Sequence, residues 1–355
     1  MSIGWTSALR RRAGHVLRPG GRAVILLYHR IAEDPADPYG LCVAPRHFEE
    51  HLEAVREAGR PMALRELANA VRTANVPDDG ICITFDDGYA DNLHVAKPLL
   101  ARHDVPATIF MTTGRAGRDR EFWWDELQRA FFEPVEVPAE IEVSVGGARL
   151  AWSLGPDAKY PEDDPRRRIA WHVHDDRSPT LRHAAFREAY MTIQPLPQEE
   201  RSRVLDELLT LVGISSADVR DSRRALEPDQ VVDLVGDGLV DVGAHTVNHP
   251  AMPAQPRAVQ HEEAARSKAD LEAWLGGEID GFAYPYGQYD DVSVGVVREA
   301  GFAWACSCDG GPARRGTDLH LLPRLEIMEC DGARLAELLS WELHGRRPRA
   351  RNRGS

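Results

Sequence analysis

Two adjacent carboxylates mark the segment of the chain that carries the most chemical information. Residues 82–85 form an apolar run that stops at Asp86 and Asp87, and a glycine follows them. Two acids at the end of a strand rarely serve packing. Because adjacent side chains diverge, one carboxylate can bind a metal while the other takes up a proton. The alternative interpretation is that one Asp caps the helix that follows.

A pair of histidines follows a second apolar run. His245 and His249 stand four residues apart, a spacing that puts both imidazoles on one face of a helical turn. Such pairs are also common on ordinary surface helices. If both strand ends share one rim, Asp87 completes a set of two histidines and one carboxylate with open positions for water and substrate. Zn²⁺ suits these ligands best, and Co²⁺, Ni²⁺ or Fe²⁺ also fit them.

A third segment, 281–290, surrounds Pro285 with aromatic residues, among them Tyr284 and Tyr286, and a glycine follows at position 287. Such a turn can present backbone N–H groups and an aromatic wall to a ligand. The alternative interpretation is a strand that simply ends in a Pro-Gly turn. Two further pairs are open in the same way: Trp123 and Trp124 form a sugar-stacking wall or part of a core, and His172 and His174 bind metal or lie in a charged loop.

The elements that must position these residues follow an α/β pattern, in which short apolar runs alternate with amphipathic helical stretches such as 45–58. Parallel neighbours need helical crossovers, so the pattern predicts a closed or nearly closed parallel barrel, with its active face at the loop ends of the strands. Seven strands are expected, at residues 23–28, 81–85, 107–111, 240–244, 279–284, 302–307 and 322–327.

The region 120–225 interrupts this rhythm and is predicted to be an insertion, either a lid or a small subdomain. It contains eight prolines and a hairpin-like stretch with Gly146 and Gly147 at its turn, and residues 181–212 are mostly helical in pattern. Residues 161–177 hold nine charged residues and are the candidate for a mobile lid.

Composition narrows the class of protein. The 355 residues carry a net charge of −13, with 43% hydrophobic and 28% charged residues, which is typical of a soluble globular protein and disfavours nucleic-acid binding. No apolar run is long enough to span a bilayer, and the apolar stretch at the N-terminus precedes its basic cluster, the reverse of a secretion signal. We therefore expect a cytoplasmic protein.

The cysteines and the C-terminal tail give weaker indications. The five cysteines are scattered without a CxxC pair and are expected to be reduced and inert. Residues 344–355 contain five arginines and no acid. They form either a disordered, solvated end or a weak contact with an anionic surface.

Three motifs taken together resemble a known family. TFDDGY at 84–89, HTVNH at 245–249 and YPYG at 284–287, in this order, are similar to those of the polysaccharide deacetylases, carbohydrate esterase family 4, which contain the chitooligosaccharide deacetylase homology domain. ILLYHRI at 25–31 and LLPRLEI at 321–327 also look like segments of this family.

The resemblance covers about residues 22–115 and 226–330 and implies a distorted (β/α) barrel. The domain organisation that we predict has a deacetylase barrel over 22–119 and 226–343, interrupted by the insertion 120–225. An N-terminal extension over 1–21 and a basic tail over 344–355 flank it.

The resemblance also implies roles for single residues. Asp86 corresponds to the catalytic base of the family, and Asp87, His245 and His249 correspond to its metal ligands. The backbone N–H of Tyr286 would help to hold the tetrahedral oxyanion. Tyr284, Pro285 and Arg324 are predicted to contact substrate.

Two departures from the family pattern limit this assignment. Ala283 stands where an arginine often orients the catalytic aspartate, and the late Leu-x-His segment that usually supplies the general acid is not evident. His29 and His320 are both candidates for that acid, and His29 is preferred because its strand should end in the same cleft. Arg324 could orient a carboxylate instead of binding substrate.

The sequence thus predicts a metal-dependent hydrolase that removes an N-acetyl or N-formyl group from an amino sugar in a glycan or glycosylated metabolite precursor. A non-catalytic carbohydrate-binding relic of the fold and a metal hydrolase of a non-sugar amide are the alternatives. The complete set of base and metal ligands argues against a relic. A cytoplasmic enzyme would meet precursors such as a sugar nucleotide, a lipid-linked glycan intermediate or a small glycosylated metabolite.

Overall fold

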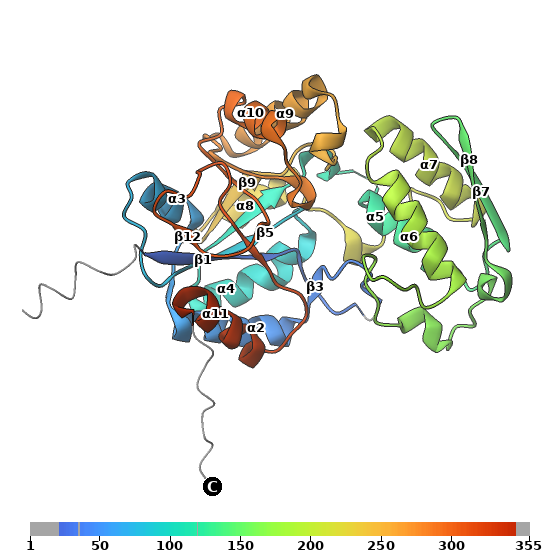
Figure 1. Cartoon of the computed structure of the whole chain (residues 1–355), viewed down its shortest axis with the longest axis horizontal. Helices are drawn as coiled ribbons and strands as arrows, with labels where there is room; N and C mark the ends of the chain where they lie inside the picture. Colours follow the sequence, from blue (N-terminus) through green and yellow to red (C-terminus); the bar gives the residue numbers. More distant parts are fainter. Residues whose placement is uncertain (1–20, 35, 119, 346–355) are drawn as a thin grey trace, which may run out of the picture.

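A curled, mostly parallel sheet forms the body of the protein (Figure 1). The computed structural model describes residues 21–34, 36–118 and 120–345. The strands β1 (Arg22–Tyr28) and β5 (Gly80–Phe85) are almost wholly buried, as expected for parallel strands covered on both faces. In spatial order the parallel strands are β11 (Trp304–Cys306), β10 (Gly281–Ala283), β9 (Val240–Ala244), β6 (Ala107–Met111), β5 (Gly80–Phe85) and β1 (Arg22–Tyr28).

The sheet curls until its two edges almost meet. β13 (Leu325–Glu326) pairs in parallel with β1, and the residue three before it, Leu322, forms a parallel bridge to Cys306 of β11. All seven predicted strands are therefore present, and the predicted distorted (β/α) barrel is confirmed. Two short strands extend the sheet, β4 (Arg60–Pro61) beside β5 and β12 (Ala313–Arg314) antiparallel to β1.

Helices cover the outside of this sheet (Figure 1). The predicted helix 45–58 is confirmed as α2 (Pro45–Ala58), which begins with a proline in its first turn and packs beside α11 (Gly332–His344). The remaining barrel helices are α3 (Leu64–Arg72), α4 (Lys97–His103) after a π-helical turn η1 (Asn92–Ala96), α8 (Pro228–Val235), α9 (Arg257–Leu275) and α10 (Asp291–Glu299). The remaining short strands, β2 (Arg30–Ile31) and β3 (Cys42–Val43), pair with each other after β1.

The insertion forms a second lobe beside the barrel (Figure 1). It holds α5 (Trp123–Phe132), the hairpin of β7 (Glu140–Val145) and β8 (Ala148–Ser153), α6 (Leu181–Ile193) and α7 (Gln198–Leu211). The predicted hairpin with Gly146 and Gly147 at its turn is confirmed. These elements bury a hydrophobic cluster of their own, separate from the barrel core.

The charged segment 161–177 is attached to that second core. Trp171 and Val173 are buried among the insertion's apolar side chains, although the segment has many charges. A prediction of mobility from charge density alone therefore leaves out these two apolar side chains, which hold the segment in place. Its role as a lid stays a prediction.

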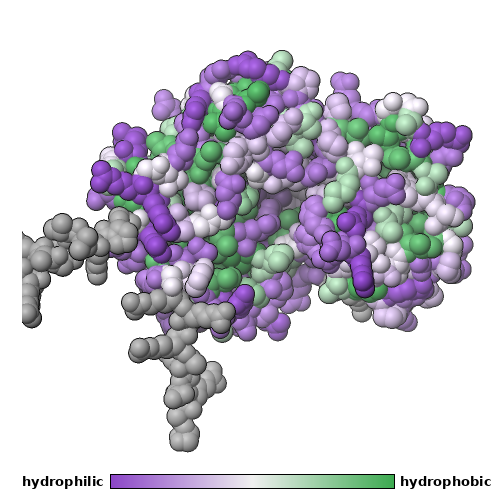
Figure 2. Space-filling view, viewed as in Figure 1, coloured by the Kyte–Doolittle hydropathy of each residue, from purple (hydrophilic) through white to green (hydrophobic). Residues whose placement is uncertain are grey.

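Three further expectations concern the cysteines, membrane spans and the two ends of the chain. All five cysteines are free thiols, as predicted. No helix within the described ranges is long and apolar enough to cross a membrane. Figure 2 shows polar residues over most of one face, with apolar residues in small groups. Residues 1–20 and 346–355, which contain most of the predicted extension and basic tail, lie outside the described residues.

Candidate active site

A cavity of about 210 Å³ lies where the carboxyl ends of the barrel strands meet the insertion. From the barrel it is lined by His29, which directly follows β1, by Asp86 and Asp87 after β5, and by His245 and His249 after β9. The three apolar runs that ended in these residues are thus neighbouring or nearby parallel strands, and their chemistry converges at one rim. The insertion supplies the opposite wall, which is formed by Trp124, His172, Val173, His174, Tyr190 and Gln194.

Asp86 is held by Arg324, which directly precedes β13, the strand that closes the barrel. Arg324 Nη1 donates to Asp86 Oδ1 over 2.6 Å and Nη2 donates to Oδ2 over 2.7 Å, so the guanidinium grips both carboxylate oxygens. Its Nε donates to the carbonyl of Ser307. Both side chains are buried. Arg324 therefore lies behind Asp86, and the predicted contact of Arg324 with substrate is replaced by its alternative role of orienting a carboxylate.

Asp87, His245 and His249 come together as the sequence pattern predicted. Their ligand atoms all lie within 4.8 Å of one another. The distance from Asp87 Oδ1 to His249 Nε2 is 3.4 Å, that to His245 Nε2 is 3.7 Å, and the two Nε2 atoms are 3.1 Å apart. His245 Nδ1 donates to the carbonyl of Ala283 over 2.8 Å, which leaves the Nε2 lone pair directed at the other two groups.

The electrostatics of these groups differ sharply within a few ångströms. Burial opposes the ionisation of Asp86, but the charge of Arg324 outweighs it and keeps the pKa below its ordinary value. Burial, and then the charge of Asp86, raise the pKa of Asp87 well above its ordinary value. Burial lowers the pKa of His245 to about 4 and lowers that of His249 well below its ordinary value. The site thus combines one stable anion with two neutral imidazoles.

The three groups fit a divalent cation. Asp87 Oδ1 is buried without a hydrogen-bond partner among the described residues, and it faces two imidazole nitrogens that carry no positive charge. An oxygen and two neutral nitrogens directed at one point are the donor set that Zn²⁺ and similar cations take in proteins. A cation there would supply the positive charge that a buried carboxylate needs.

The backbone at the site adopts conformations that side chains rarely tolerate. Asp87, Thr246, His249 and Tyr286 have positive φ angles of 73°, 65°, 53° and 59°. Residues held in this region store strain, and such strain gathers at functional sites where the surrounding structure enforces it. The helical-turn geometry assumed for the histidine pair is therefore wrong in detail, because the segment after β9 turns through left-handed residues instead.

The other predicted residues divide into two groups. His29 and Tyr286 line the cavity, and Tyr286 packs its ring against His249 with centroids 4.4 Å apart. Tyr284 points into the barrel core, where its hydroxyl donates to the carbonyl of His320. The imidazole of His320 bonds the carbonyl of Phe302 and is not among the cavity-lining residues.

The aromatic wall predicted from the 281–290 segment is therefore wrong for Tyr284 and Pro285. Pro285 is buried in the turn, and neither residue lines the cavity. Strand alternation explains this result, because Tyr284 continues β10 with its side chain on the core side. The wall is supplied instead by Trp124, whose ring centroid lies 4.7 Å from that of His249.

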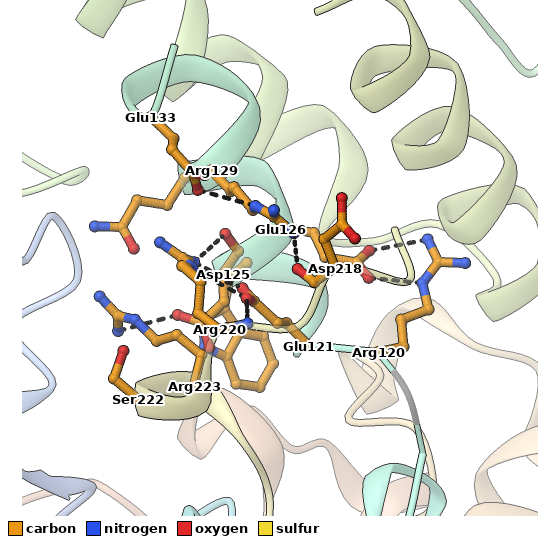
Figure 3. A network of polar contacts seen from close by, with 12 residues as sticks. Arg120, Glu121, Asp125, Glu126, Arg129, Glu133, Asp218, Arg220, Ser222 and Arg223 are labelled. Atoms are coloured by element: carbon orange, nitrogen blue, oxygen red, sulfur yellow. Dashed lines mark hydrogen bonds and ion pairs between the residues drawn. The ribbon is translucent and has the colours of Figure 1, made fainter. Parts of the chain in front are cut away.

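Trp124 is fixed by a buried polar chain that joins the insertion to the barrel. Its indole N–H donates to the Tyr89 hydroxyl over 2.8 Å, and that hydroxyl donates to Asp125 over 2.6 Å. Asp125 in turn pairs with Arg223 over 3.1 Å, and Arg220 pairs with Glu121 close by (Figure 3). The ion pairs hold the start of α5 against the chain that returns to the barrel.

Sequence reasoning missed most of the insertion's share of the cavity. Tyr190 lies on the last turn of α6 and Gln194 directly follows that helix, and nothing in their spacing distinguishes a cavity wall from a core. His172 and His174, for which the sequence leaves metal binding or a charged loop open, line the cavity, and His172 Nε2 bonds the carbonyl of Tyr39. Among the described residues they join no cluster of three possible metal ligands. Glu326 of β13, which no motif singled out, also lines the cavity.

Fold and cavity together define the class of this protein: a (β/α) barrel with a buried carboxylate–arginine pair beside an Asp–His–His set. The comparisons with known proteins agree with this class. The family model described as polysaccharide deacetylase matches residues 73–139 and 203–305. YxkH of Bacillus subtilis (strain 168), which is named for the same family, is 35% identical over 106 residues, or 29% of this chain. That match spans only 37% of the length of YxkH.

Two solved structures share the whole fold. IcaB from Ammonifex degensii has a TM-score of 0.56 at 17% identity, with 92% of this chain and 98% of that chain covered. The Streptococcus pyogenes deacetylase PplD, solved in complex with acetate, has a TM-score of 0.53 at 19% identity, with 87% and 93% covered. At these identities the likeness concerns the fold. The family model and the curated relative thus show a polysaccharide deacetylase domain in this chain, matched over residues 73–139 and 203–305.

Proposed function

We propose that this protein is a metal-dependent deacylase that hydrolyses the N-acetyl, or N-formyl, group of an amino sugar. One observation carries the proposal: an ionised, arginine-held carboxylate lies beside an Asp–His–His set in a single cavity. The match to the polysaccharide deacetylase family model supports the same reaction class. The balanced reaction consumes one water and one amide and releases a short carboxylic acid and an amine.

Asp87, His245 and His249 would hold the divalent metal, with Zn²⁺ preferred by the donor set. When bound, the metal would polarise the acyl carbonyl and favour deprotonation of a water molecule. The protein prepares these ligands in advance. The hydrogen bond from His245 Nδ1 to Ala283 fixes the ring and its tautomer, and the rings of Trp124 and Tyr286 pack against His249.

Asp86 would take the proton from the attacking water. A general base must be unprotonated at working pH, and the charge of Arg324 secures this for a carboxylate that burial alone would neutralise. The two hydrogen bonds from the guanidinium also fix the plane of the carboxylate. Its Oδ2 lies 3.8 Å from His245 Nε2, so the proton acceptor is adjacent to the ligand set.

His29 would return a proton to the leaving amine. An amine is a poor leaving group until it is protonated, and His29 is a cavity-lining imidazole that belongs to neither the ligand set nor the Asp86 pair. The backbone N–H of Tyr286, held in its left-handed turn, would contribute to stabilising the oxyanion. The predicted domain organisation fits this scheme, with residues 120–225 as a small subdomain that forms the outer wall of the cavity.

Hydrolysis of acylated amino sugars, followed by mass spectrometry of both products, tests the proposal. Zn²⁺- or Co²⁺-loaded protein should release acetate or formate in equal amounts with free amine. Asp86→Asn should keep its metal and lose most of the activity, since a carboxamide cannot accept the proton. His29→Ala should lower kcat with the metal content unchanged, and amides should suffer more than esters with good leaving groups. Full activity of metal-free protein would overturn the assignment, and equal losses on both substrate types would remove His29 from the acid role.

A further inference from the structure

The charged side chains that line the cavity are all acidic. Asp86, Asp87 and Glu326 reach it, and none of the cavity-lining residues that the structure describes is a lysine or an arginine. Arg324 is fully buried behind Asp86, and both of its terminal nitrogens are committed to that carboxylate. The reaction described above accounts for Asp86 and Asp87. It leaves Glu326 without a role.

Glu326 occupies a defined place in the seam that closes the barrel. It lies on β13 and pairs with Leu27 of β1 in the strand register. Leu27 stands two residues before His29. Both Leu27 and His29 line the cavity, so Glu326 stands beside the strand that leads to the catalytic rim. The side chain is exposed to the cavity and solvent, and no described residue forms a hydrogen bond or ion pair with its carboxylate.

The cavity-lining residues that face Glu326 include no lysine or arginine, and Arg187, whose charge reaches His174, does not itself line the cavity. His174 and Tyr190, which come from the insertion, lie within the reach of the charge of Glu326. Burial lowers the pKa of His174, so its imidazole is neutral at pH 7 despite the opposing influence of Glu326. Burial, with the charges of Asp87 and Glu326, raises the pKa of Tyr190. The carboxylate thus has neutral neighbours and an open side toward a ligand.

We propose that Glu326 is a specificity-determining residue that binds an ammonium group of the substrate. This inference rests on the proposed function and names its substrate class: an amino-sugar oligosaccharide that already carries a free amine beside the acylated one. The ammonium would pair with Glu326 while the acyl group lies at Asp86 and the metal ligands. Such a ligand also presents hydroxyls and hydrophobic ring faces to the wall formed by Trp124 and Tyr190.

The same charges disfavour an anionic substrate. The pyrophosphate of a sugar nucleotide normally binds to arginine, lysine or backbone N–H groups. Here it would meet Glu326, and no described cavity-lining side chain is a lysine or an arginine that offsets the repulsion. The divalent metal of the proposed function would lie at Asp87, His245 and His249, where the acyl group binds. Among the precursors considered from the sequence, a small cationic glycan or glycosylated metabolite therefore fits the cavity better than a sugar nucleotide.

Three probes separate these possibilities: the disaccharide of glucosamine and N-acetylglucosamine, the di-N-acetylated disaccharide, and UDP-N-acetylglucosamine. Assays at about pH 6 keep the free amine protonated. Wild-type protein should hydrolyse the cationic disaccharide with a kcat/KM about threefold to tenfold above that for the neutral one, as expected for a partly exposed ion pair. Glu326→Gln, which keeps the shape and the ability to bond hydroxyls, should erase this preference, so that the variant hydrolyses both disaccharides with the same kcat/KM.

Glu262→Gln is the matched control, because Glu262 is an exposed carboxylate on α9 that does not line the cavity. It should preserve the preference. Equal kcat/KM for both disaccharides in wild-type protein, or a preference that survives in Glu326→Gln, overturns the role of Glu326 while the proposed function stands. Turnover of the nucleotide sugar above both disaccharides also overturns it. Absence of hydrolysis of all three probes by metal-loaded protein counts against the proposed function itself.

Discussion

Replacing Arg324 by methionine should destabilise the protein strongly as well as inactivate it. Methionine fills most of the volume of the arginine stem but leaves Asp86 as a buried carboxylate without a partner. The carbonyl of Ser307 also loses its hydrogen bond from Arg324 Nε, and Thr84 Oγ1 loses the 3.4 Å contact with Nη1.

The magnitude follows from the burial of the pair. Removing one partner of a buried ion pair costs about 3–5 kcal/mol, because the remaining charge is uncompensated. For a protein of this size about 1 kcal/mol corresponds to a shift of about 2 °C in Tm, so Arg324→Met should lower Tm by about 6–10 °C. The double variant Asp86→Leu with Arg324→Met removes both charges and should recover much of that loss, since no lone charge remains.

Thermal unfolding of the metal-free proteins, followed by circular dichroism, measures this effect without interference from metal binding. Arg298→Met is the control, because Arg298 pairs with Asp318 on the surface with both side chains about half exposed. It should shift Tm by no more than about 2 °C. A Tm of Arg324→Met as high as that of the control would refute the argument that the pair is a buried, mutually dependent unit.

Three further predictions test the metal site, the insertion and the barrel packing. His245→Ala should lower the metal content measured by plasma mass spectrometry well below one ion per chain, and wild-type levels would remove His245 from the ligand set. Burial lowers the pKa of His183 to about 4, so the unfolded chain binds its proton first and stability falls as pH drops from about 6.5 toward 4. His183→Gln should therefore reduce the loss of stability between pH 7 and pH 5 by about 1–2 kcal/mol in urea titrations, and an unchanged loss would contradict the shift. Gly281→Ala would place a Cβ 2.1 Å from the Trp304 ring and should cost about 1–3 kcal/mol, whereas Gly277→Ala, with open space around it, should be nearly neutral in the same titrations.

The barrel could be predicted from sequence because its signal is local. Strands β1 and β5 are buried on both faces, and each appears in the sequence as a continuous apolar run that ends in a polar residue. The helices that connect successive strands then make these strands parallel, so their carboxyl ends lie at the same edge of the sheet. The proximity of Asp86, Asp87 and His245 could therefore be predicted from the sequence alone.

The position of Tyr284 could not be predicted in the same way. It stands in the YPYG motif two residues before Tyr286, so strand alternation alone would place both side chains on the same face, yet Tyr286 lines the cavity and Tyr284 does not. The strand had been expected to run from residue 279 to 284, but it ends at Ala283 and the turn that follows sends Tyr286 into a left-handed conformation. A shift of one residue in the end of the strand changes which side chain faces the cavity and which is buried in the core.

The contribution of the insertion to the cavity could be predicted even less, because it depends on contacts between residues far apart in the sequence. Trp124 reaches His249 only because Tyr89 and Asp125 hold it there, and Arg223 returns from almost 100 residues further along the chain. Each of these residues taken alone reads as an ordinary buried polar or aromatic side chain. Together they place Trp124 against His249, and this placement depends on the packing of the insertion against the barrel.

Closure of the barrel and assembly of the reaction site are consequences of the same strand pairing. The family's usual arginine is missing at Ala283, and the guanidinium that holds Asp86 comes instead from Arg324, just before β13. When β13 pairs with β1, it places Arg324 behind Asp86 and Glu326 beside the strand that carries His29. A chain in which this last parallel strand has not docked would have a buried aspartate without its counter-charge. The site is therefore completed only after the barrel is closed, and its specificity residue is carried by the strand that closes it.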